Sequence, residues 1–287
     1  MNDMAKNTPT VSEIVDELAK EQPPKRIWEV DFVRGLMILF VVWDHFMYDV
    51  SAFEPYQSGL FNWLYALSAR YYSGVLRQVA QPVFVTMFVF TSGVSCSFSR
   101  SNGKRALRMM AFALLFTAAT RAAEEIVRAD VTIYFNVIHV IALSVALYTA
   151  VEWVWKKCVK GWQKNLFGIV MTAVTLAVII VGACANAKPW TNDNPLWFFL
   201  AMHNSQKVPA FTHFYGGDYL PFFPAFGWFL VGAFLGKFLY RQRQSLFPTV
   251  NEKWVCPVTF CGRHAIWIYF GSQLFMYGLF YLFCVLI

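Results

Sequence analysis

The chain has 287 residues, of which 57% are hydrophobic and 18% aromatic, whereas only 14% carry a charged side chain. Because an ordinary soluble domain is about one quarter charged, this composition excludes a soluble protein and indicates a polytopic protein of the lipid bilayer. The formal net charge of +7 comes from Lys and Arg residues spread over several loops without a recognisable binding motif, so we expect no nucleic-acid partner.

Apolar segments follow one another almost without interruption from residue 32 to the end of the chain. Residues 1–25 have no apolar core of signal-peptide type, so we expect an uncleaved cytoplasmic tail, followed by one transmembrane domain over residues 26–287. Segments of about membrane-spanning length predict seven helices, at residues 32–48, 79–98, 107–120, 131–151, 166–184, 220–240 and 264–286. The fold class is therefore all-α, a polytopic transmembrane helical bundle.

Three segments need separate interpretation. Residues 107–120 are short for a span, and we expect them to extend towards residue 126, to tilt little, or to lie beside thinned bilayer. Residues 62–72 are aromatic but interrupted, which predicts an interfacial helix on the non-cytoplasmic side. Residues 185–219 form a long connection in which aromatic and hydrogen-bonding side chains alternate, a composition that suits a sugar-like acceptor and a membrane-interface belt equally well.

Glycines in the sixth predicted span indicate close packing of that helix. Gly227, Gly232 and Gly236 are spaced so that a neighbouring helix can approach its backbone.

Lys and Arg residues are unevenly divided between alternating loops. With Arg34 set aside as intramembrane, 17 lie on the side of the N-terminus and 6 on the other side. The positive-inside rule then places the N-terminus in the cytoplasm, and an odd number of spans places the C-terminus outside. We expect a multi-pass protein of the cytoplasmic (inner) membrane.

Ionisable residues interrupt the first span, which reads DFVRGLMILFVVWDHFMYD over residues 31–49. In a helix, the 11 positions from Arg34 to His45 return to within about 20° of the same face and separate the two residues by about 16 Å along the axis. Asp31 and Asp49 fall on that face as well. Charge inside a bilayer indicates a catalytic or transport path. The simpler alternative is an Asp31–Arg34 pair that anchors the helix start, with His45 as an ordinary bundle histidine.

Other polar residues recur at particular places in the apolar sequence. Asn136 and His139 stand three residues apart inside the fourth predicted span and so share a helix face. Arg263 and His264 open the last span, and Asp218 precedes the sixth. We select these residues as candidates for substrate binding. Each also has a simpler interpretation, as a bundle histidine, a helix N-terminal residue or a positive-inside anchor.

The chain contains five short motifs, in the order RIWEVDFVRGL with WDHF, FVFTSGVSCSFSR, IYFNVIHVIALS, DYLPFFPAFGWFLVGAFLG and GRHAIWIY. Motifs of this kind, in this order, resemble those of bacterial proteins related to the catalytic domain of heparan-alpha-glucosaminide N-acetyltransferase. The resemblance covers residues 26–277. The spacing of Arg34 and His45 also resembles the signature of the wider membrane acyltransferase type 3 group. The resemblance implies that an acyl-CoA donor on the cytoplasmic side meets an acceptor from the other side, with a membrane histidine carrying the chemistry.

The chain departs from this family in two respects. Relatives often read Y-L-x-H-Q in the last span, whereas residues 269–273 read YFGSQ, so that Ser272 replaces a histidine. The large N-terminal lumenal region of the animal enzyme also has no counterpart. Heparan is therefore not carried over as the acceptor.

Acyl transfer from a thioester requires a base or a nucleophile, and the imidazole of His45 can serve as either near neutral pH. Asp49, one turn beyond, can orient the ring, whereas Asp44 points about 100° away from His45. The donor's phosphates require cationic groups on the cytoplasmic side. We assign that role to the site made by Arg34 with Asp31, Arg105 and Arg108.

The sequence therefore predicts an integral membrane acyltransferase that moves an acyl group, most simply acetyl from acetyl-CoA, to an amine or hydroxyl of an extracytoplasmic glycan or envelope acceptor. A transporter or proton-coupled permease would use the same intramembrane Arg, His and Asp groups, although no inverted repeat is evident. A structural subunit would leave the buried charges without a role. Six cysteines without C-x-x-C spacing predict no metal site. The acceptor, the acyl group, an acyl-histidine intermediate and a homodimeric assembly stay open.

Overall fold

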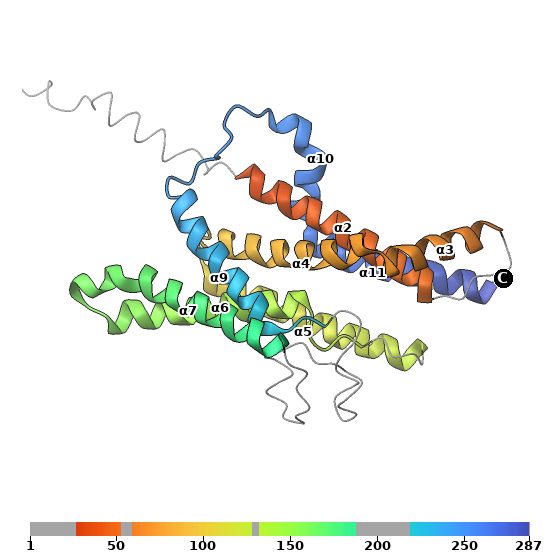
Figure 1. Ribbon diagram of the computed structural model, residues 1–287, viewed down its shortest axis with the longest axis horizontal. Coiled ribbons are helices and arrows are strands. Elements are labelled where there is room, and N and C mark those ends of the chain that lie inside the picture. The colour runs from red at the N-terminus through yellow and green to blue at the C-terminus, as the bar shows by residue number, and fades with distance from the viewer. Residues whose placement is uncertain (1–26, 53–58, 128–131, 188–218, 287) are drawn as a thin grey trace, which may run out of the picture.

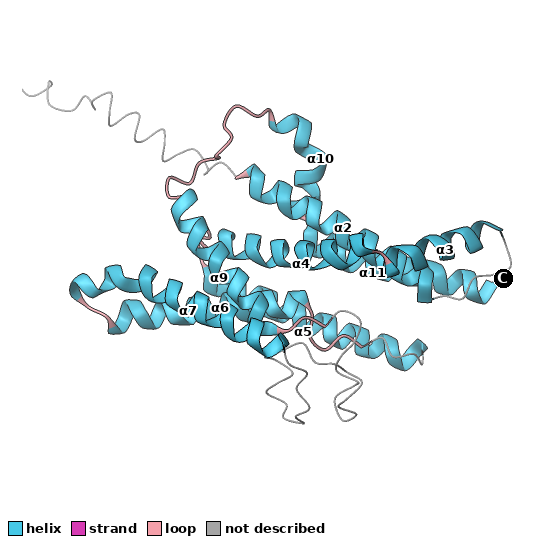
Figure 2. Cartoon of the chain, in the orientation of Figure 1, coloured by secondary structure: helices cyan, strands magenta, loops and turns pink. Residues whose placement is uncertain are grey.

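The computed structural model describes residues 27–52, 59–127, 132–187 and 219–286, and every regular element in these ranges is a helix (Figures 1 and 2). The α-helices are α2 (Trp28–Ala52), α3 (Gly59–Ser73), α4 (Val75–Ser95), α5 (Asn102–Val127), α6 (Val137–Cys158), α7 (Phe167–Ala187), α9 (Phe222–Leu239), α10 (Glu252–Arg263) and α11 (Ala265–Leu286), with the 3₁₀ helix η1 (Gly161–Leu166) before α7. The all-α prediction is confirmed. Asp218 and almost all of the 185–219 connection lie outside the described residues.

Most predicted segments coincide with helices. The structure differs from the prediction at α5 and at the start of α6, and it adds α10, which was not predicted. Helix α5 continues well beyond residue 120, to Val127. Of the alternatives considered for residues 107–120, this agrees with extension of the segment towards residue 126. The expectation that Asn136 lies inside a span is wrong, because α6 begins only at Val137. Asn136 is its N-cap and accepts a hydrogen bond from the backbone N–H of Ile138, which satisfies a donor that the helix start leaves unpaired.

Four helices of the described chain are long and apolar enough to cross a membrane, namely α4, α5 up to Ile126, α6 and α9. Residues 167–182 of α7 and 265–280 of α11 are shorter apolar stretches. Helix α2 has 25 residues, a length that would cross a core of about 30 Å, but it carries Glu29, Asp31, Arg34 and two further aspartates. The count of seven spans and the orientation of the termini therefore stay predictions.

Glycines bring two pairs of helices into backbone contact. A Cβ atom on Gly93 of α4 would overlap the carbonyl oxygen of Phe229 of α9, and one on Gly232 would overlap that of Phe90. Gly35 of α2 and Gly262 of α10 meet in the same way, Gly262 against the carbonyl oxygen of Asp31. The predicted close approach at Gly232 is confirmed, and these contacts fix the positions of α2 and α4 relative to their neighbours.

The core lies between these helices, and the outer faces are apolar. Buried side chains of α4, α6 and α9 form one cluster around Phe229, Val89 and Val140, and those of α2, α5, α6 and α11 form a second around Ile38 and Phe116. Large apolar side chains are exposed along α4, α5, α7 and α11. Such extensive exposed apolar surface is expected of a protein whose solvent is lipid.

Gly93→Ala should destabilise the protein, because the new methyl group has no space against the backbone of α9. Overpacking of this kind costs about 1–3 kcal/mol, and thermal unfolding in detergent should report a lower midpoint. Gly271→Ala in α11 is the matched control, since no neighbouring atom lies within 4 Å of the place that its new methyl group would take. Equal midpoints for the two variants would contradict the proposed close contact of α4 and α9.

Candidate functional site

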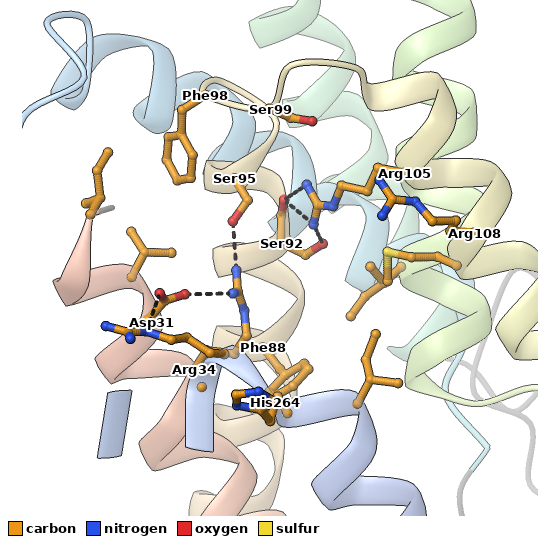
Figure 3. A pocket seen from close by; sticks show the side chains of 18 of the residues that line it. Asp31, Arg34, Phe88, Ser92, Ser95, Phe98, Ser99, Arg105, Arg108 and His264 are labelled. Carbon is orange, nitrogen blue, oxygen red and sulfur yellow. Dashed lines mark hydrogen bonds and ion pairs between the residues drawn. The ribbon is translucent and has the colours of Figure 1, made fainter. Parts of the chain in front are cut away.

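A cavity of about 710 Å³ lies where the N-terminal part of α2 meets α4, α5, α10 and the start of α11 (Figure 3). We call it the basic cavity, because the arginines that line it are Arg34, Arg100, Arg105, Arg108, Arg243 and Arg263. Among its lining residues only Asp31 carries a carboxylate. Six guanidinium groups against one carboxylate make the cavity strongly positive, which favours an anionic ligand.

The guanidinium of Arg34 is held from two sides. Its Nη1 lies 3.3 Å from Oδ1 of Asp31, one turn earlier on α2, and its Nη2 donates to the hydroxyl of Ser95 on α4 at 2.7 Å (Figure 3). The other oxygen of Asp31 lies 3.6 Å from Nε of Arg263 at the end of α10. The buried Asp31 carboxylate therefore connects arginines of two helices and orients both at the wall of the cavity.

Arg105 and Arg108 differ in how far the protein engages them. Arg105 donates from both terminal nitrogens to the carbonyl oxygen of Ser92 at 3.2 Å, and from Nη2 to the Ser92 hydroxyl at 2.7 Å. It thereby ties α5 to the end of α4 (Figure 3). Arg108 is exposed, and its Nε lies 3.4 Å from the carbonyl oxygen of Lys104 in its own helix. Arg108 can therefore turn towards a ligand with little loss of internal contacts.

His45 lies deeper along α2 and does not line the basic cavity. Its Nδ1 is 2.8 Å from the carbonyl oxygen of Val41. Because a carbonyl can only accept, Nδ1 carries the hydrogen, and in the neutral ring the lone pair sits on Nε2. The half-buried imidazole and the ring of Tyr269 of α11 are perpendicular, with centroids 5.6 Å apart and planes at 89°. Asp49 is buried one turn further on.

Tyr269 connects His45 to the start of α6. The Nδ2 of Asn136 donates to the Tyr269 hydroxyl at 3.4 Å, and the backbone N–H of Asn136 donates to Nδ1 of His139 at 3.3 Å. The Thr117 hydroxyl donates to the carbonyl oxygen of Ile133, so its oxygen accepts from Nε2 of His139 at 3.0 Å. Nδ1 of His139 therefore stabilises the start of α6 and Nε2 ties it to α5, while Tyr269 contacts both His45 and Asn136.

A second ion pair fixes the middle of α2. Asp44 accepts hydrogen bonds from Nε and Nη2 of Arg77 at 2.8 and 3.2 Å and from the Tyr71 hydroxyl at 2.9 Å. The Arg77 guanidinium also lies over the ring of Tyr72, 4.1 Å from its centroid. Burial and the Asp44 carboxylate raise the pKa of Tyr71, so this hydroxyl stays a hydrogen-bond donor. Asp44 thus faces α3 and α4 and holds its neighbour His45 in register.

The structure groups the candidate residues differently from the sequence-based assignment. The four residues that the sequence assigns to binding of the acyl-CoA donor all line the basic cavity. Arg263 and His264, which the sequence assigns to binding of the substrate, line the same cavity. Their assignment to a separate substrate group is therefore not supported by their position. Sequence reasoning missed Ser95, Arg77 and Tyr269. Of these, Ser95 and Tyr269 lie within the FVFTSGVSCSFSR and GRHAIWIY motifs, which was the one signal that could have pointed to them.

Similarity to known proteins identifies the family of the chain. No curated protein and no solved structure matches the chain. Residues 26–274 match the family described as heparan-alpha-glucosaminide N-acetyltransferase, catalytic, a family of transmembrane acetyltransferases with acetyl-CoA as donor. This range contains all of the residues discussed above, and a transporter is not favoured. The chain therefore belongs to the family of the heparan-alpha-glucosaminide N-acetyltransferase catalytic domain.

Proposed function

We propose that the protein moves the acetyl group of cytoplasmic acetyl-CoA to an amine or hydroxyl of an extracytoplasmic glycan or other envelope acceptor. His45 acts as the base or the nucleophile. Asp49 stabilises the charged form of its ring. In this proposal the protein lies in the cytoplasmic membrane, and the arginine-rich end of the bundle faces the cytoplasm, in agreement with the positive-inside rule.

The observation that carries this proposal is that one helix, α2, both lines the basic cavity near its N-terminus and carries His45 further along. The phosphates of CoA are suited to guanidinium groups, which form charge-assisted hydrogen bonds to them. Arg34, already oriented by Asp31 and Ser95, is about 16 Å from His45 along the helix axis. CoA has a long, narrow pantetheine arm between its phosphates and its thioester, so phosphates in the cavity would direct the thioester towards His45.

The chemistry requires few groups. In the base mechanism, Nε2 of His45 takes the proton of the acceptor as its nitrogen or oxygen attacks the thioester carbonyl carbon. The new C–N or C–O bond forms, the C–S bond breaks, and the proton passes to the departing CoA thiolate. In the nucleophile mechanism, Nε2 itself carries the acetyl group between the two substrates. The Nδ1–H bond to Val41 supports either route, because it leaves the lone pair on Nε2.

The acceptor side is assigned to the region of Tyr269 and Asn136. Tyr269 is buried against His45, and its hydroxyl meets the Asn136 amide, so an acceptor near His45 would approach this pair. His139 contributes by positioning Asn136, while Asp218 remains a predicted lining residue. We move Arg263 and His264 to the donor side, because both line the basic cavity.

His45→Ala should abolish acetyl transfer while leaving the protein inserted and folded. Loss of a general base typically lowers the rate by about 10²–10⁴-fold, and loss of a nucleophile lowers it further. The measurement is transfer from radiolabelled acetyl-CoA to a panel of amino sugars by purified protein. Tyr48→Phe, at an exposed position of the same helix, serves as the control. Wild-type turnover by His45→Ala at an unchanged melting temperature would exclude His45 from the chemistry.

Arg34→Ala should weaken CoA binding, whereas Arg70→Ala should not. Arg34 lines the basic cavity, while Arg70 is exposed at the end of α3. A hydrogen bond to a charged group contributes about 1.5–3 kcal/mol, so Kd should rise by roughly tenfold or more. Isothermal calorimetry of CoA with the protein in detergent measures this difference. Equal effects of the two substitutions would indicate that the phosphates bind elsewhere.

A further inference from the structure

Apolar side chains are exposed on a polar segment that does not span the membrane. The segment consists of the 241–251 loop and α10, and we call it the surface segment. Its exposed large apolar residues are Leu246, Phe247, Val250, Trp254 and Phe260. Trp254 is 86% exposed, the highest value among the exposed large hydrophobic residues of the described chain. Exposed aromatic side chains in such a position indicate a binding surface.

Helix α10 has the geometry of an in-plane helix. Its 12 residues reach only about 18 Å, which is too short for a hydrocarbon core of about 30 Å. It lies across the long direction of the neighbouring helices (Figure 1). Thr259 and Gly262 are buried on the side that packs against α2, while Trp254, Pro257 and Phe260 recur at intervals of three and are exposed. One face is therefore docked and the opposite face is apolar.

The loop before α10 is held in place by a buried carboxylate. Oε2 of Glu29 accepts from the Ser245 hydroxyl at 3.0 Å, and Oε1 accepts from the backbone N–H of Leu246 at 2.7 Å. The ring of Phe247 contacts Trp28, with centroids 6.4 Å apart. Glu29 itself is only 8% exposed. These contacts to α2 fix the loop, so the apolar side chains next to them are presented in a defined arrangement.

Charge identifies the partner. The segment carries the exposed basic residues Arg241, Arg243, Lys253 and Arg263 beside its apolar ones, and Glu252 is its one acidic residue. Aromatic side chains interleaved with Lys and Arg on a short amphipathic helix complement a lipid leaflet that carries negative headgroups. A water-soluble acidic protein would not require so many exposed apolar side chains.

We propose that the surface segment binds anionic phospholipid, with Trp254, Phe260 and Phe247 inserted at the level of the headgroups and Arg241 and Lys253 on the phosphates. Because Arg263 at the end of α10 pairs with Asp31, the bound lipid also fixes one wall of the basic cavity. The proposal does not depend on acetyl transfer and holds for any function of the cavity.

Arg241→Gln/Lys253→Gln should weaken binding of phosphatidylglycerol by roughly tenfold or more, since each basic side chain near an anionic surface contributes to binding. Native mass spectrometry of the purified protein with mixed lipids measures phosphatidylglycerol and phosphatidylcholine retention side by side. Neither substituted residue lines the cavity. Lys157→Gln/Lys160→Gln, which removes one exposed charge from the last turn of α6 and one from the residues that follow it, is the matched control and should retain the lipid. Equal losses would reduce the effect to general surface charge and overturn the proposal.

Brominated lipids test the depth of the segment independently of any charge substitution. In proteoliposomes, bromine near the headgroups should quench wild-type tryptophan fluorescence more than that of Trp254→Phe, and bromine near the bilayer centre should quench both equally. No difference near the headgroups would contradict insertion of Trp254. Displacement of phosphatidylglycerol by inorganic phosphate alone, or a lipid-free dimer that Trp254→Ser dissociates, would assign the surface to a soluble anion or to a second copy, and each would overturn the proposal.

Discussion

Charged side chains of α2 must find partners inside the protein, and this constraint determines how the neighbouring helices are arranged. Glu29, Asp31, Asp44 and Asp49 are all buried, although burial of a charge in an apolar environment is costly unless it is paired. Glu29 binds the loop before α10, Asp31 binds Arg34 and Arg263, and Asp44 binds Arg77. Three successive levels of α2 are thus attached to different parts of the chain.

The same attachments separate the two chemical regions of α2. Near the N-terminus of the helix, the Asp31 network holds arginines around a positive cavity that suits phosphate groups. Further along, the Asp44–Arg77 pair holds the helix beside α3 and α4, so that His45 meets Tyr269 of α11. Glycine contacts between α2 and α10 bring the backbones close enough for Arg263 to reach Asp31. Structural ion pairs and the proposed reaction therefore share one helix without sharing the same side chains, apart from Asp31 and Arg34.

The sequence indicated the helical bundle and several arginines of the basic cavity because both stand out locally. Long apolar runs predict helices by length alone, and charges next to such runs are conspicuous. Helix α10 was missed because it is neither long nor continuously apolar. The start of α6 was misplaced because an apolar run does not reveal that Asn136 caps the helix. Tyr269 could not be singled out from the other tyrosines, since its contacts to His45 and Asn136 arise only when α11 packs against α2 and the Tyr269 hydroxyl reaches the start of α6.

In the mechanism that we propose, donor and acceptor reach His45 from opposite sides of the membrane. Reconstitution into vesicles in one orientation, with the arginine-rich end outside, tests it directly. Radiolabelled acetyl-CoA is supplied only outside and an amino sugar is enclosed only inside. Our account predicts acetylated sugar within the vesicles while CoA stays outside. Product that forms only when donor and acceptor are on the same side would contradict it.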